Sequence, residues 1–180
     1  MSNLELETFS AGNLRVINQA VELAEELVSN HYKMSANQWL RGRYDVKTLT
    51  DLSDQEIVHG PFAQIVRYQA RKRDAMLGSS SYDFYKICLQ DHNILSTLSK
   101  SSGMQLLPFS LYILTHELIH IVRFGKFLQS FDASEEEKLA EETRVHDKTH
   151  QILKTVNVSG IEEVFQFYFQ WLIPQSAAWD

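Results

Sequence analysis

The chain has 180 residues, of which 44% are hydrophobic and 22% are charged. This composition is typical of a globular protein with a sizeable core, so we expect a single domain over residues 1–180. The net charge of −6 argues against a general nucleic-acid-binding protein, so we expect no nucleic acid partner.

Cysteine content and apolar runs bear on the compartment. Cys88 is the single cysteine, which excludes an intramolecular disulfide and a cysteine-rich zinc site and fits a reducing compartment. The first ten residues have neither a basic nor an apolar segment, so we expect no signal peptide. The most apolar run, 106–124, contains His116, Glu117, His120 and Arg123, which favours a core helix over a membrane span. We therefore expect a cytoplasmic protein without a membrane span.

Helical periodicity dominates the chain. Only seven glycines and three prolines interrupt it. Apolar residues recur at helical spacing in segments 14–32, 61–76, 82–98, 106–124, 134–154 and 161–171. A short extended piece is expected at 44–49. The predicted fold class is all-α: a mainly helical bundle of about six helices with at most a minor β-hairpin.

The predicted helix 82–98 carries a carboxylate on its apolar face. Asp91 lies there with Phe84, Ile87 and Cys88, and such a carboxylate could orient a metal-bound histidine from behind. His92, next to it, is a second candidate for that supporting role. The alternative for both is a polar residue at the border of an apolar stripe.

The segment 106–124 contains the sequence His116-Glu117-Leu118-Ile119-His120. Histidines four residues apart lie on one face of a helix, so both imidazoles can reach one metal ion. In zinc peptidases this H-E-x-x-H pattern supplies two ligands and a glutamate general base. The flanks are apolar on nearly all sides, which predicts a buried helix whose polar groups need partners. A metal is one such partner; hydrogen bonds within the core are the alternative.

The segment 134–154 adds two further candidates. Ser134 and Glu137 form a capping-box pattern that predicts the start of this helix. Glu142 and His146 fall on its apolar stripe, whereas Glu141 is expected to face water. The aromatic segment 161–171 follows, and we expect it to cover the core or to form a homodimer contact.

On these residues the chain resembles the zincin metallopeptidases, in the branch that has a glutamate ligand downstream of H-E-x-x-H. Glu142 follows His120 by 22 positions, as that pattern requires. The resemblance implies that His116, His120 and Glu142 bind zinc, that a water completes the coordination, and that Glu117 takes the proton of that water. His146 is a possible fourth ligand, which would close the site.

Two other readings of these residues stay open. Glu117 and His120 also form an E-x-x-H pattern, as in helical di-iron carboxylate proteins, although the second pair of that family is missing. A mononuclear metal site without catalysis is the third reading. Ligation by histidine and glutamate suits zinc but also iron or manganese.

The expected function is a metal-dependent hydrolase. Zincin peptidases bind an extended substrate along the edge of a β-sheet upstream of the active helix. Since the upstream region shows almost no strand pattern, we expect a small molecule or another short substrate.

Overall fold

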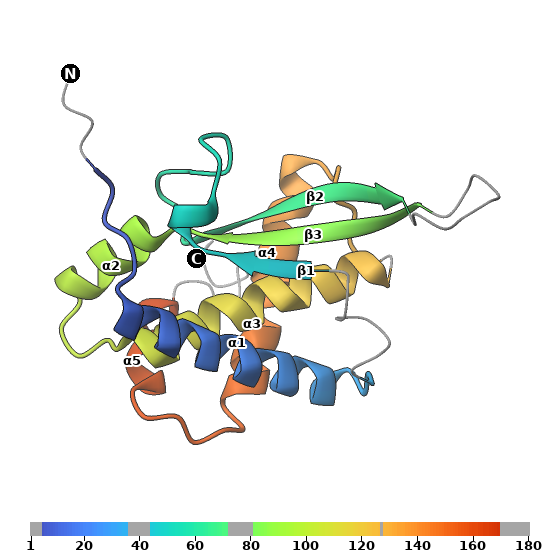
Figure 1. Ribbon diagram of the computed structural model, residues 1–180. Helices are drawn as coiled ribbons and strands as arrows, with labels where there is room; N and C mark the ends of the chain where they lie inside the picture. The colour runs from blue at the N-terminus through green and yellow to red at the C-terminus, as the bar shows by residue number, and fades with distance from the viewer. Residues whose placement is uncertain (1–4, 36–43, 72–80, 127, 170–180) are drawn as a thin grey trace. The chain divides into compact units, whose positions relative to one another are not determined.

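The computed structural model describes residues 5–35, 44–71, 81–126 and 128–169. Five α-helices and three β-strands lie in these ranges (Figure 1). The helices are α1 (Ala11–His31), α2 (Asp91–Lys100), α3 (Leu106–Gly125), α4 (Glu135–Leu153) and α5 (Ile161–Phe167). The strands are β1 (Tyr44–Lys47), β2 (Ala63–Arg71) and β3 (Ser81–Leu89), and a short 3₁₀ helix, η1, spans Leu49–Asp51.

The prediction of an all-α bundle is wrong, because the chain contains a mixed β-sheet. Its strand order is β1-β3-β2, with β2 antiparallel and β1 parallel to β3 (Figure 1). Within the predicted helix 61–76 the structure has β2 at Ala63–Arg71, and the predicted helix 82–98 is divided between β3 and α2. The extended piece expected at 44–49 contains β1, Tyr44–Lys47, but Leu49 already begins η1.

Two periodicities coexist in the sequence of β3, which explains the error. Phe84, Ile87 and Cys88 have helical spacing, but Tyr85, Ile87 and Leu89 alternate and are all buried. Local spacing cannot separate a short helix from a strand in such a run. Hydrogen bonding to β2 and β1 selects the strand, and those partners are distant in sequence.

Contacts between residues divide the chain into two compact units. One unit comprises residues 1–11 and 35–100, with the sheet and α2; the other comprises 12–34 and 101–180, with α3, α4, α5 and nearly all of α1. The prediction of one domain over residues 1–180 stays a prediction.

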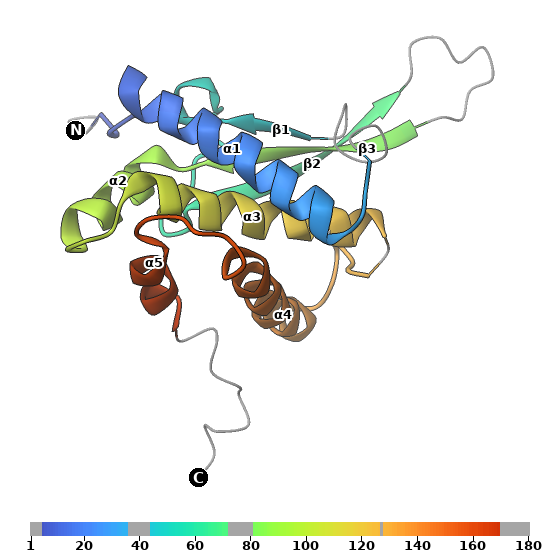
Figure 2. The ribbon, with the colours of Figure 1, turned by 90° about the horizontal axis from the view of Figure 1, so that it is seen from below.

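The helical unit is built around α3. This helix is buried along nearly all of its length, as its apolar sequence predicts. In Figure 2, α4 and α5 lie below α3, and both helices contact it. The predicted capping box at Ser134 is confirmed: its side chain accepts from the Glu137 backbone N–H, and the Glu137 carboxylate accepts from the Ser134 N–H.

None of the helices in the described parts of the chain combines the length and the hydropathy that a membrane crossing needs.

Candidate metal centre

The two histidines of the H-E-x-x-H sequence point their outer ring nitrogens at each other. They are on successive turns of α3, with 7% of His116 and 5% of His120 exposed. The Nε2 atoms of His116 and His120 are 3.1 Å apart. This convergence is what the spacing of four residues predicts for one helix face.

Glu142 of α4 completes the cluster. Its Oε2 lies 3.1 Å from His116 Nε2, and its Oε1 lies 2.9 Å from His120 Nε2. Glu142 is half-buried, and the stripe that it begins on α4 continues through the buried residues Val145, His146 and Thr149. The structure thus brings together three of the predicted ligands from two helices.

These distances fit a shared metal ion. In a tetrahedral zinc site with bonds of about 2.0–2.1 Å, neighbouring ligand atoms are about 3.3–3.4 Å apart. The two Nε2 atoms are 3.1 Å apart, and each lies 2.9 to 3.1 Å from its nearer Glu142 oxygen, just below that spacing. Small outward movements of the three side chains would therefore accommodate an ion.

The electrostatics of the cluster favour a cation between these groups. Burial opposes a low pKa for Glu142, but hydrogen bonds from His116 and His120 outweigh it and hold the pKa of Glu142 far below its usual value. Burial also opposes charge on His120, yet the hydrogen bond to Glu142 and the charge of Glu117 raise its pKa. A proton on His120 thus stabilises the cluster by placing positive charge beside the carboxylates. A metal ion at the same place would supply positive charge in the same way.

A residue outside the helices orients His120. The Nδ1–H of His120 donates to Oε1 of Gln129, at 3.0 Å. An amide oxygen only accepts, so this contact places a proton on Nδ1 and directs Nε2 toward Glu142. A hydrogen bond of this kind is the usual support of a metal-bound histidine. Sequence reasoning missed Gln129, which follows α3 in a loop that carries no helical pattern.

His146 lies beside the three donors, at a longer distance. Its Nε2 is 3.9 Å from Glu142 Oε2, and the ligand atoms of His116, Glu142 and His146 all lie within 4.8 Å of one another. Burial, followed by the charge of His116, lowers the pKa of His146 to about 3, so its ring is neutral, the form that binds metals.

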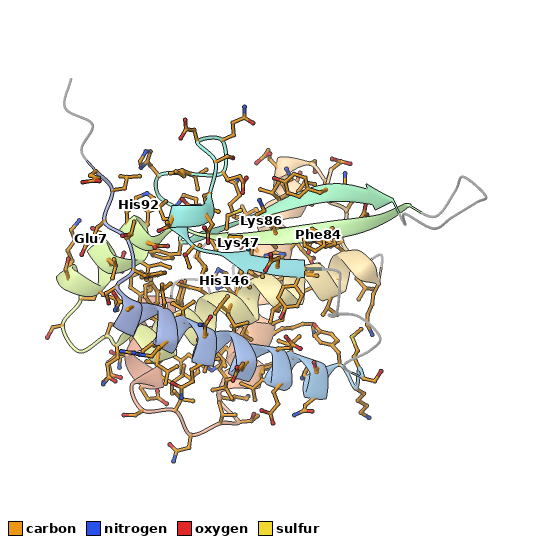
Figure 3. The ribbon with its side chains drawn as sticks, in the orientation of Figure 1. Glu7, Lys47, Phe84, Lys86, His92 and His146 are labelled. Atoms are coloured by element: carbon orange, nitrogen blue, oxygen red, sulfur yellow. The ribbon has the colours of Figure 1, made fainter. Side chains whose placement is uncertain are left out.

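Tyr112 holds the ring of His146 from behind. The hydroxyl of Tyr112 and Nδ1 of His146 are joined by a hydrogen bond of 2.8 Å, which leaves Nε2 on the side of Glu142. The Tyr112 ring also stacks on Tyr168, with ring centres 4.1 Å apart and planes 8° from parallel. Tyr112 precedes His116 by one helical turn, so its spacing could have identified it. His146 is labelled in Figure 3.

Glu117, the predicted general base, is half-buried on α3 next to His116. Burial raises the pKa of its carboxyl group, and the charges of His116 and His120 oppose that effect. The carboxyl group is therefore within electrostatic range of both histidines. Its assignment as base stays a prediction.

Asp91 and His92 belong to the unit that contains the sheet. Asp91 is the first residue of α2, and its two carboxylate oxygens accept from the backbone N–H groups of Phe9 (2.9 Å) and Leu49 (3.0 Å). The ring of His92, labelled in Figure 3, packs edge-on against that of His59, with centres 5.3 Å apart. These contacts serve the fold of that unit; the predicted support of a metal ligand stays a prediction.

Glu141 departs from expectation, because it is buried and does not face water. Only 5% of it is exposed, and its carboxylate pairs with Arg123 of α3 and with Arg144. Glu141 precedes the buried Val145 by one turn, which puts it at the edge of the apolar stripe. The arginine partners offset the loss of water there.

Comparison with known proteins identifies no relative: no protein-family model, no curated protein and no solved structure matches this chain. The function is therefore inferred from the residues of the site alone.

Proposed function

We propose that the protein is a mononuclear metal-dependent hydrolase. His116, His120 and Glu142 would hold the ion, with zinc preferred and iron or manganese as alternatives, and Glu117 would act as general base. One observation carries this proposal: the Nε2 atoms of His116 and His120 lie 3.1 Å apart, and each lies 2.9 to 3.1 Å from one carboxylate oxygen of Glu142 on the other helix. Two imidazoles and one carboxylate form a known ligand set of catalytic zinc sites.

Each residue has a distinct role in the proposed reaction. A divalent ion held by these residues would act as a Lewis acid and would polarise a carbonyl group and a water molecule. Gln129 keeps Nε2 of His120 directed at the ion. Glu117 accepts the proton of the attacking water and passes it to the leaving group, as a carboxylate beside such a site can do.

The sheet bears on the proposed substrate. The resemblance to zincin metallopeptidases implies a β-sheet upstream of the active helix, and β1, β2 and β3 do precede α3 in the chain. The missing strand pattern was the ground for expecting a small molecule or another short substrate, and because strands are present upstream, that pattern no longer argues against a peptide. We therefore propose a small molecule or a short peptide as substrate.

A non-catalytic metal site is the second candidate, and His146 favours it. A neutral histidine with Nε2 3.9 Å from Glu142 could move in as a fourth ligand. Four protein ligands close a tetrahedral zinc site, and closed sites are structural. A di-iron centre has less support, because the donors described above converge on one position.

Metal content tests the ligand assignment. We expect about one metal per chain in the purified protein, measured by inductively coupled plasma mass spectrometry. His116→Ala and His120→Ala should lose it and should melt at a lower temperature. His150→Ala is the matched control, since His150 is one turn beyond His146 on α4 and should keep the metal. Full occupancy in both of the first two variants would refute the assigned ligands.

Glu117→Gln and His146→Ala separate the candidate functions. In a hydrolase, Glu117→Gln keeps the metal but loses turnover of ester and short-peptide substrates, because only the base is removed. In a di-iron centre the same variant loses metal. His146→Ala should retain metal if the site is open and should lose it if His146 is a structural ligand.

Two further proposals concern the setting of the protein. We place it in the cytoplasm, because Cys88 is a lone, buried free thiol.

We also propose a homodimer contact through the aromatic segment 161–171, where Phe167 and Phe169 are 39% and 61% exposed. Residues 170 and 171 lie outside the described ranges. Light scattering coupled to size-exclusion chromatography, on wild type and Phe169→Ser, tests the dimer.

A further inference from the structure

A buried ion pair joins α3 to α4 beside the candidate metal centre. Arg123 and Glu141 are 6% and 5% exposed. The guanidinium group uses two nitrogens: Nε donates to Oε1 of Glu141, and Nη2 donates to Oε2 at 3.3 Å. Arg123 follows the ligand His120 by three residues, and Glu141 directly precedes the ligand Glu142. The pair therefore links the two helices next to both ligands.

The same arginine also holds the loop after α3. The backbone N–H of Leu128 donates to the carbonyl oxygen of Arg123 at 2.9 Å, and Nη2 of Arg123 makes a longer contact of 3.5 Å to the Leu128 carbonyl. Gln129, the hydrogen-bond partner of His120, comes next in the chain. Arg123 thus contacts both segments that shape the surroundings of His120.

Net stability is a weak explanation for such a pair. Removing two charges from water costs about as much as their attraction returns, so an apolar pair of similar size is often equally stable. A fork of two hydrogen bonds to a carboxylate is, however, strongly directional. It fixes how far α4 is shifted and rotated relative to α3.

We propose that Arg123 is the positioning residue of the metal centre. Through Glu141 it sets the register of α4, so that Glu142 faces His116 and His120. Through Leu128 it holds the loop so that Gln129 stays against Nδ1 of His120. The inference rests on the proposed metal site and concerns how the chain holds its ligands in place before the ion binds.

Arg144 provides a matched control within the chain. It also donates to Glu141, but from the same helix, three residues further on, and its side chain is 53% exposed. It lines a cavity of about 270 Å³ together with Gln129 and Glu141. Arg144 can share the charge of Glu141, yet its contact with Glu141 does not connect α3 to α4.

The experiment measures metal affinity separately from folding. The double variant Arg123→Met/Glu141→Met replaces the ion pair by apolar side chains, and Arg123→Lys keeps the charge but loses the fork. Affinity for Zn²⁺ is measured by competition with a chromophoric chelator, the ligand geometry by the visible absorption of the Co²⁺ form, and folding of the metal-free protein by thermal melting.

For the double variant we expect an unchanged melting temperature without metal and a 10- to 100-fold weaker affinity for Zn²⁺, about the loss seen when other supports of metal ligands are removed. Arg123→Lys should weaken binding by about tenfold, and Arg144→Met should match wild type. Wild-type affinity in the double variant or in Arg123→Lys would overturn the inference, and Arg123→Lys decides alone if the double variant does not fold. A wild-type protein that binds neither ion would instead refute the proposed function.

Discussion

Replacing Asp91 by Asn distinguishes a role in the fold from a role at the metal centre. The carboxylate of Asp91 accepts two backbone hydrogen bonds from segments 82 and 42 residues away in sequence, at Phe9 and Leu49. Both donor residues are buried, with 7% and 6% exposed. An asparagine side chain has one oxygen that can accept and one NH₂ group that cannot.

The expected loss follows from this count. Asp91→Asn keeps one of the two bonds and leaves one buried N–H facing another donor, which costs about 1–3 kcal/mol. For a chain of this length that corresponds to a decrease in melting temperature of about 2–12 °C. Asp91→Ala removes both acceptors and should cost roughly twice as much.

The assay is thermal unfolding followed by circular dichroism, paired with Zn²⁺ affinity measured well below the melting temperature. Asp51→Asn is the control, because Asp51 is exposed and such changes stay within about 0.5 kcal/mol. We expect Asp91→Asn to lower stability and to leave affinity unchanged. Unchanged stability with a tenfold loss of affinity would refute this reasoning and support Asp91 as a partner of a metal ligand.

Three further predictions concern single positions. Burial, aided by the hydrogen bond to Glu56, raises the pKa of the Cys88 thiol to about 12, so iodoacetamide should label Cys88 at pH 8 only after denaturation; rapid labelling of the native protein would contradict its burial. Gly160→Ala should destabilise the protein by about 1–2 kcal/mol, measured by urea unfolding, because residue 160 has φ +85° and an added Cβ would lie 3.2 Å from Pro108. Ser134→Ala should cost about 1 kcal/mol in the same assay, because it removes the cap of α4; no change in either variant would show that these local features contribute nothing.

The positions of the helices that carry the site could be predicted from sequence alone, because their patterns are long. The segment predicted as 106–124 is α3, Leu106–Gly125, and the segment predicted as 134–154 is α4 with its cap at Ser134. The pairing of His116 with His120 follows from a spacing of four within one helix. Placing Glu142 and His146 on the inner face of α4 needed only its apolar stripe.

Only the tertiary structure could decide the sheet and the surroundings of the ligands. The strands β2 and β3 are stabilised by pairing between distant segments, and their local pattern also fits a helix. Gln129 reaches His120 from a loop, and Arg123 reaches Glu141 from another helix. Contacts of this kind depend on how elements pack in three dimensions, whereas helical periodicity reports only the face on which a residue lies.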